Sequence, residues 1–291
     1  MPARAIGRNV YIFDPRDPGT ILGGLMVTNG MTNTNFYSMV EIIFIFTTDY
    51  TLHRGQKSGP TIKRDDNPLQ EGSYFVVTSG SLTINSEHWL IRADSLDPGP
   101  PTAEFCNSIR NRDRRCVISG ARASSIHRGY WAGFSVTHIF PLAHEKYWNI
   151  HNYGSSISTL PKSGRSIDSV QNGILLRSDI RCHFESYLVS INPDDNYKIV
   201  FFQDDNFGIT DTHLSNLEAF LADPQRPLDQ LLRWHYRQAV LANVRGQGEL
   251  LFECHFPRDP DVPDEGVELG GDKTSLSGHS AGSSKGKSIA R

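Results

Sequence analysis

The stretch Val136-Thr-His-Ile-Phe-Pro141 decides the fold, together with Asn172-Gly-Ile-Leu-Leu-Arg-Ser-Asp-Ile180 and the His183-Phe184 pair that follows it. A histidine, an asparagine and a second histidine thus come in order along the chain. An imidazole has an ordinary pKa near 6.5 and accepts a proton near neutral pH, so His138 is a candidate general base. This order of residues indicates a chemical site centred on His138.

The rest of the chain divides into three regions by sequence texture. Residues 1–104 hold short β-rich runs (Val10–Phe13, Ile42–Phe46, Tyr74–Val77 and Ser81–Asn85) separated by turn residues, which predicts an N-terminal β-rich domain. Residues 105–258 mix both kinds of element, with a hairpin expected over 188–202 and helices over 214–222 and 228–242. Residues 259–291 are rich in glycine and serine and lack aromatic residues, which predicts a disordered tail.

The sequence resembles fungal proteins that carry an HNH endonuclease-like domain, a ββα metal finger. The resemblance rests on the segments around His138 and Asn172. It extends to the N-terminal stretch 65–75 (DDNPLQEGSYF) and to 231–241 (LLRWHYRQAVL), followed by Gly246-Gln-Gly-Glu249. It therefore covers roughly residues 8–258. The fold expected from it is α+β, an N-terminal β-rich domain plus an HNH-like ββα finger with additional helices.

The resemblance also implies roles for particular residues. His138 matches the general base that activates water, and Asn172 matches the amide that orients this base. In such nucleases a divalent ion stabilises the leaving oxygen. Its ligands are the last histidine of the motif and, usually, an acidic residue or histidine just before the base. Mg²⁺ or another divalent metal is therefore the cofactor expected of a nuclease here.

Both metal-ligand positions depart from the family pattern. Thr137 stands before the base and coordinates a metal only weakly. The closing pattern Asp-Ile-His of the family becomes Asp179-Ile180-Arg181, and a guanidinium offers only donors and carries a permanent positive charge. Arg181 therefore cannot bind a cation. It either contacts an anionic group directly or pairs with Asp179 or Glu185.

His183 is the alternative metal ligand. A shift of two residues along a helix turns the side chain by about 200°, nearly to the opposite face. His183 would then reach a metal shared with His138 only after a local change of register. Otherwise it is a structural histidine. The sequence leaves both interpretations open and does not say whether any metal binds.

The charge balance bears on nucleic-acid binding. The 291 residues hold 29 basic and 32 acidic side chains, a net charge of −3, whereas proteins that grip phosphates usually have a basic surplus. Arginines concentrate between residues 110 and 128, where they form either a phosphate-contacting edge beside the finger or a solvated surface loop. Nucleic acid is thus a possible partner but is disfavoured.

Three functions remain open. We favour an HNH-like protein that no longer cuts nucleic acid and acts instead on a small molecule, as a cyclase or pericyclase of fungal secondary-metabolite biosynthesis. This enzyme would need no cofactor, and His138, Asn172 and Arg181 would form its catalytic site. A metal-dependent endonuclease with His138 as base is the alternative, and a non-catalytic binding module is the second alternative. The four cysteines lack the close spacing of a zinc ribbon or disulfide framework. Since no long apolar segment suggests secretion or a membrane, we expect a soluble intracellular protein, in the cytoplasm rather than the nucleus.

Overall fold

The computed structural model describes residues 4–90, 101–124 and 126–248, all of which belong to one compact unit, Met1–Phe256. The fold is α+β, as the sequence predicts. The expected tail over 259–291, and the last part of the region expected over 105–258, lie outside the described residues. The boundary expected between residues 104 and 105 stays a prediction.

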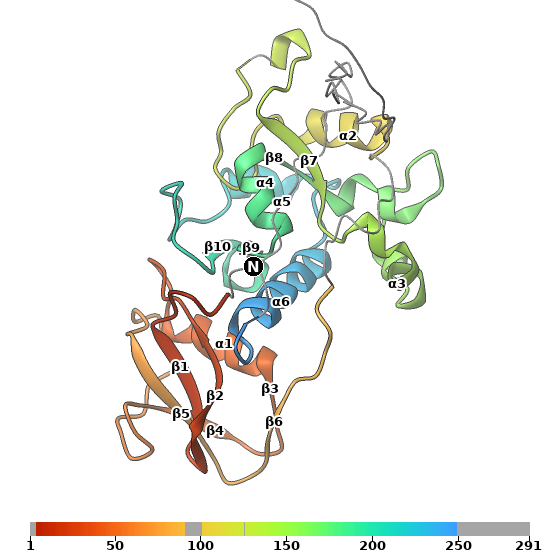
Figure 1. Ribbon diagram of the computed structural model, residues 1–291. Coiled ribbons are helices and arrows are strands. Elements are labelled where there is room, and N and C mark those ends of the chain that lie inside the picture. The colour runs from red at the N-terminus through yellow and green to blue at the C-terminus, as the bar shows by residue number, and fades with distance from the viewer. Residues whose placement is uncertain (1–3, 91–100, 125, 249–291) are drawn as a thin grey trace, which may run out of the picture. The chain divides into compact units, whose positions relative to one another are not determined.

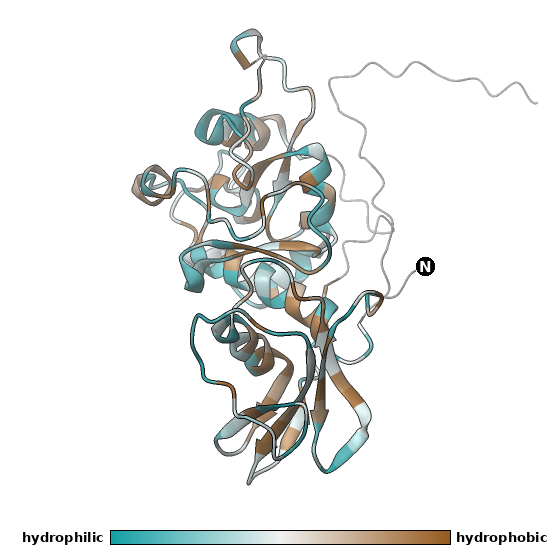
Figure 2. Ribbon diagram, turned by 90° about the vertical axis from the view of Figure 1, so that its left-hand side faces the viewer, coloured by the Kyte–Doolittle hydropathy of each residue, from teal (hydrophilic) through white to brown (hydrophobic). Residues whose placement is uncertain are grey.

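The N-terminal region is built on a four-stranded sheet with strand order β2-β1-β5-β4 (Figure 1). The first strand pairs antiparallel with the second and parallel with the fifth, and the fourth and fifth pair antiparallel. Hydrophobic and hydrophilic segments both occur along this region (Figure 2), and β2 runs from an exposed first half into a buried end. Their bounds are β1 Val10–Asp14, β2 Asp17–Leu25, β4 Tyr50–Arg54 and β5 Gly72–Thr78.

The apolar run around residues 39–47 forms the end of a helix and then a short strand. Helix α1 (Asn33–Ile43) begins at Thr32, which forms a capping box with Asn35, and it gives way to β3 (Phe44–Phe46). Strand β3 pairs with β6 (Leu82–Ile84). The strand expected from residue 42 was therefore placed too early, because the capping box starts a helix whose buried face continues as far as Ile43.

The second region contains an antiparallel strand pair, a hairpin and several helices. Strand β7 (Phe134–His138) pairs with β8 (Gly173–Arg177), and helix α4 (Ser178–Glu185) follows β8 directly. The hairpin expected over 188–202 is present as β9 (Val189–Asn192) and β10 (Lys198–Phe201). The other helices are α2 Ala103–Asp113, α3 Glu145–Ile150, α5 Leu217–Ala222 and α6 Asp229–Val244. Short 3-10 helices span Ile126–Arg128, Leu142–His144, Tyr153–Ser156, Ser166–Asp168, Val170–Asn172 and Pro193–Asp195.

Helix α6 contributes to two apolar clusters. Its first half, including Leu232 and Trp234, packs with the β7–β8 region, and the Trp234 ring lies 4.5 Å from that of Phe140. Its second half, including Val240 and Val244, packs with the N-terminal sheet and α1. Figure 1 shows α6 beside α1 and the β9–β10 pair. This helix thereby ties the HNH-like region to the N-terminal region. Within residues 4–90, 101–124 and 126–248, no helix is long and apolar enough to cross a membrane.

Candidate functional site

The two strands that carry the motif lie side by side and lead into α4, which gives a ββα arrangement. In the β7–β8 register, His138 at the end of one strand faces Gly173 at the start of the other. Asn172 therefore immediately precedes the strand that pairs with the strand of the candidate base. The structure brings His138, Asn172 and α4 together as the sequence predicts for a ββα finger.

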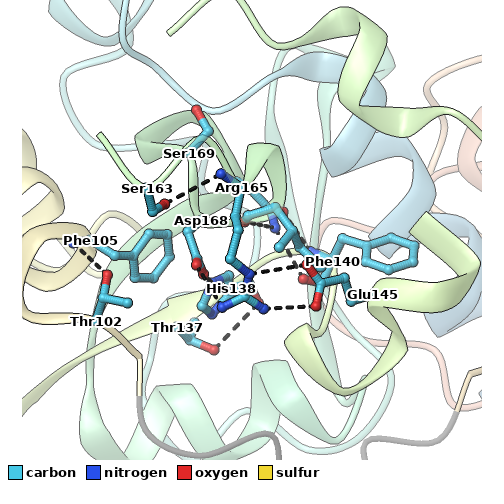
Figure 3. A network of polar contacts seen from close by, with 12 residues as sticks. Thr102, Phe105, Thr137, His138, Phe140, Glu145, Ser163, Arg165, Asp168 and Ser169 are labelled. Atoms are coloured by element: carbon cyan, nitrogen blue, oxygen red, sulfur yellow. Dashed lines mark hydrogen bonds and ion pairs between the residues drawn. The ribbon is translucent and has the colours of Figure 1, made fainter. Parts of the chain in front are cut away.

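His138 is buried and held from two sides. Only 5% of the residue is exposed. Its Nε2 lies 3.2 Å from Oδ1 of Asp168, and its ring stacks on that of Phe105 with centroids 3.9 Å apart and planes 10° from parallel (Figure 3). The carboxylate and the phenyl ring together restrict the imidazole to one orientation.

Gly173 makes the stacking of Phe105 on His138 possible. A Cβ atom added at Gly173 would lie 2.6 Å from Cζ of Phe105 and 2.2 Å from Cδ1 of Ile109, both on α2. Real Cβ atoms essentially never come so close to another heavy atom. The Asn172-Gly173 pair is thus explained by two needs, an amide at one position and room for α2 at the next.

Asp168 links the candidate base to an exposed ion pair. The second oxygen, Oδ2, lies 3.2 Å from Nη1 of Arg165, whose guanidinium also donates to Glu145 at 2.7 and 3.1 Å (Figure 3). The hydrogen bond with His138 lowers the pKa of the Asp168 carboxyl below its ordinary value, against the effect of burial. The positive charge of Arg165, and that of His138 when it is protonated, act in the same direction. Asp168 is therefore a carboxylate at neutral pH.

In the Asp168→Asn variant, we expect the free energy of unfolding to depend less on pH in the acid range, because this carboxylate is removed. The folded pKa of Asp168 lies below the unfolded value of about 3.9. Its contribution to the free energy of unfolding is fully present above that value, and it is lost as the pH falls through the lower folded pKa. Urea unfolding should therefore show the native chain more stable than the variant at neutral pH, by a margin that shrinks below about pH 4. A margin that stays constant or grows on acidification contradicts this account.

Asn172 acts on the backbone that follows the candidate base. Its Oδ1 accepts the N–H of Phe140 at 2.9 Å, and its Nδ2 donates to the carbonyls of Phe140 at 3.2 Å and Ile167 at 2.9 Å. The side chain is completely buried. It joins the segment after His138 to the segment that carries Asp168. These contacts are with the backbone on both sides of the His138–Asp168 contact, and the orienting role expected of Asn172 stays a prediction.

The side chains at 137 and 181, where the resemblance implies metal ligands, both contact the carboxylate of Glu185. Oγ1 of Thr137 donates to Oε1 of Glu185 at 2.5 Å, and Nε of Arg181 donates to the same oxygen at 2.9 Å. Thr137 is buried and the Arg181 side chain is 16% exposed. Of the two carboxylates that the sequence offered to Arg181, the structure pairs it with Glu185, one turn further along α4.

These residues do not fit a divalent cation held as in the HNH family. At the two positions where the resemblance implies metal ligands, Arg181 carries a guanidinium and the hydroxyl of Thr137 donates to Glu185. Among the residues that the structure describes, no group of three histidine, cysteine or acidic side chains is placed to hold a metal. Beside Glu185, the positive charge is that of the Arg181 guanidinium.

His183 and Asp179 contact each other and other neighbours on α4 and nearby, rather than Arg181. Nδ1 of His183 contacts the backbone carbonyl of Asp179 at 3.0 Å, and its ring meets the ring of Phe207 edge to face at 4.9 Å. Asp179 forms an ion pair with Arg177 and accepts the N–H of Ile180 at 2.8 Å. The role of His183 as an alternative ligand stays a prediction.

The arginines between residues 110 and 128 include one with a clear structural task. Arg112 is nearly fully buried, forms an ion pair with Asp113 at 2.6 Å, and donates to the carbonyls of Val170 and Gly173 at 2.7 Å each. It therefore fixes the backbone on both sides of Asn172. Arg110 stacks over the Trp131 ring, with Cζ 5.6 Å from the centroid. A phosphate-contacting role for the other arginines stays a prediction.

Sequence reasoning missed Asp168, Arg165 and Phe105. Asp168 lies between Ile167 and Ser169 in a mixed polar and apolar segment, so no local pattern marks it as a partner of His138. Arg165 forms an ion pair with Glu145 as well as with Asp168, and its role depends on how these separate segments pack. Phe105 carries no signal, since its stacking depends on how α2 packs.

Comparison with known proteins finds two family models along the chain. Residues 7–83 match a domain of unknown function, DUF8573, and residues 116–192 match the model described as HNH endonuclease. The second match includes β7, β8 and α4 with His138 and Asn172. No curated protein and no solved structure matches the chain. The chain therefore contains an HNH-like domain over residues 116–192.

Proposed function

We propose that this protein is an enzyme that acts on a small organic molecule by acid–base catalysis at His138, without a divalent metal ion. The observation that carries the proposal is the contrast within the HNH-like domain. His138 is paired with Asp168, whereas Thr137 and Arg181, at the positions where the resemblance implies metal ligands, both bind Glu185.

The chemistry available to such a site differs from that of a nuclease. Phosphodiester hydrolysis builds negative charge on the phosphate and the leaving oxygen, which a divalent ion neutralises in HNH nucleases. The His138–Asp168 pair supplies proton transfer. When Nε2–H donates to Asp168, the lone pair lies on Nδ1, and the carboxylate stabilises the imidazolium that forms when Nδ1 accepts a proton. This suits the removal of a proton from carbon or oxygen, followed by ring closure or elimination.

The reaction class we favour is therefore that of a cyclase, pericyclase or lyase in secondary metabolism. The pathway assignment rests on the resemblance to fungal proteins, because fold analogy by itself does not establish function. Within the class, His138 is the base, Asp168 orients it and holds its tautomer, and Asn172 fixes the backbone on both sides of this pair.

A plasmid-nicking assay separates this proposal from the nuclease alternative. We expect no conversion of supercoiled plasmid to the nicked form with Mg²⁺, Mn²⁺ or Zn²⁺, because a guanidinium and a hydroxyl bound to Glu185 are poor ligands for a cation. The matched control is His138→Gln, which keeps a polar side chain but removes the imidazole. Nicking by the native chain that His138→Gln abolishes would restore the endonuclease and end the proposal.

Metabolite profiling of the native host tests the catalytic role directly. A strain lacking the protein should accumulate a precursor and lack its product. The native chain should restore the product, and His138→Gln should fail to do so although it is produced and folded. Full restoration by His138→Gln would contradict catalysis and favour a binding role for the domain.

A further inference from the structure

The guanidinium of Arg181 uses only one of its nitrogen atoms in hydrogen bonds with the described residues. Its Nε is engaged with Glu185 at 2.9 Å. Within residues 4–90, 101–124 and 126–248, neither Nη1 nor Nη2 donates to any group. The side chain is 16% exposed, so its charged end is mostly shielded from water yet still reachable. A guanidinium anchored through Nε presents the parallel N–H groups of its two Nη atoms to a ligand.

The anchoring also relates Arg181 to the candidate base. Glu185 accepts from both Arg181 and Thr137, and Thr137 directly precedes His138 on β7. Two hydrogen bonds to one carboxylate oxygen thus tie the guanidinium to the strand of the base. Arg181 also stands at the position that holds the metal ligand in the family, so a positive charge is kept where the family keeps one.

The charges on α4 favour a ligand with one anionic group over a polyanion. Arg177 is paired with Asp179, and Arg181 is paired with Glu185, so each arginine of this segment already has an acidic partner. A nucleic-acid strand requires a series of cations for its successive phosphates. A single carboxylate requires only one fork of two N–H groups, which matches its two oxygens.

We propose that the Nη groups of Arg181 bind a carboxylate of the small-molecule substrate. This inference rests on the proposed function, because it takes the ligand to be the substrate of the His138 site. It narrows the substrate class to small carboxylic acids, and it makes Arg181 a binding residue.

Calorimetric titration of the full chain with two probes tests this inference. Benzoate stands for a monocarboxylate, and dimethyl phosphate stands for a single phosphodiester. Benzoate should bind the native chain, and Arg181→Gln should weaken its binding by about tenfold or more, because a charge-assisted pair of hydrogen bonds is lost. Arg181→Lys keeps the positive charge but loses the pair of parallel N–H groups. We expect its affinity for benzoate to lie between that of the native chain and that of Arg181→Gln.

Arg177→Gln is the matched control, since it removes the same charge from the start of the same helix. It should change the benzoate affinity by less than about twofold, since Arg177 is already paired with Asp179. Three results overturn the inference: equal benzoate affinity in Arg181→Gln and Arg177→Gln, tighter binding of dimethyl phosphate than of benzoate, or no binding of benzoate to the native chain. Should Arg181→Gln fail to fold, the comparison of Arg181→Lys with Arg177→Gln decides.

The outcome is separable from that of the proposed function. Benzoate binding that depends on Arg181, together with full complementation by His138→Gln, supports the carboxylate site and refutes catalysis by His138. Unchanged benzoate binding in Arg181→Gln, together with failed complementation by His138→Gln, refutes the carboxylate site alone.

Discussion

Replacing Asn172 with alanine is expected to lower the free energy of unfolding by about 3–5 kcal/mol. The side chain is fully buried and makes three hydrogen bonds to backbone groups of Phe140 and Ile167. Alanine leaves one N–H and two carbonyls of these residues without this partner inside the protein. An unsatisfied buried polar group costs about 1–3 kcal/mol, which gives an effect of this size for three groups.

Urea unfolding followed by circular dichroism measures this effect. Asn149→Ala is the matched control, because Asn149 is exposed and its change should alter the free energy of unfolding by no more than about 0.5 kcal/mol. Asn172→Asp keeps an acceptor for Phe140 but loses the donors, and it should also destabilise the protein. A loss below about 1 kcal/mol in Asn172→Ala would contradict the positioning role assigned to this residue.

Restoring the family residues at two positions is expected to create a metal site. In the variant Thr137→Asp with Arg181→His, the side chains at 137 and 181 both lie next to Glu185, because each native side chain contacts its Oε1. Aspartate, histidine and glutamate would then offer three ligands of the kinds that bind Zn²⁺ and Mn²⁺. We expect binding of one Mn²⁺ or Zn²⁺ per chain in the micromolar range, measured by calorimetry.

The same design contains its control. Adding Glu185→Gln to the double variant removes the carboxylate at the meeting point and should weaken metal binding by at least about tenfold. The single variant Thr137→Asp keeps Arg181, whose positive charge disfavours a cation, and should bind no metal. Metal binding by Thr137→Asp alone would contradict the conclusion that Arg181 excludes the ion.

The parts of the fold that follow from local patterns could be predicted from the sequence. The family resemblance carried by the segments around His138 and Asn172 implied the ββα arrangement, which the strand pair β7–β8 and α4 confirm. The hairpin over 188–202 was equally predictable, because its turn residues separate two apolar runs. Helix α1 was missed, because the apolar run at its end has the composition of a strand and its start depends on the capping box at Thr32.

The candidate site could be predicted only in part, because its partners come from separate segments. Asp168 reaches His138 from the 3-10 helix before Asn172, and Phe105 reaches it from α2. Neither contact has a fixed spacing along the chain. The sequence narrowed the partner of Arg181 to Asp179 or Glu185 without choosing between them. The structure favours Glu185 since residues four apart share one face of a helix, whereas residues two apart do not.

Arg181 and Glu185 meet where the resemblance places a metal, and we propose that the chemistry of this HNH-like domain depends on His138 and Asp168. Electron paramagnetic resonance of Mn²⁺ added to the native chain tests it most directly, because free and bound Mn²⁺ give distinct signals. The account predicts that the signal of free Mn²⁺ is the same with the native chain as with Glu185→Gln, and that it falls only with the double variant Thr137→Asp and Arg181→His. One equivalent of Mn²⁺ bound by the native chain and lost in Glu185→Gln would contradict it.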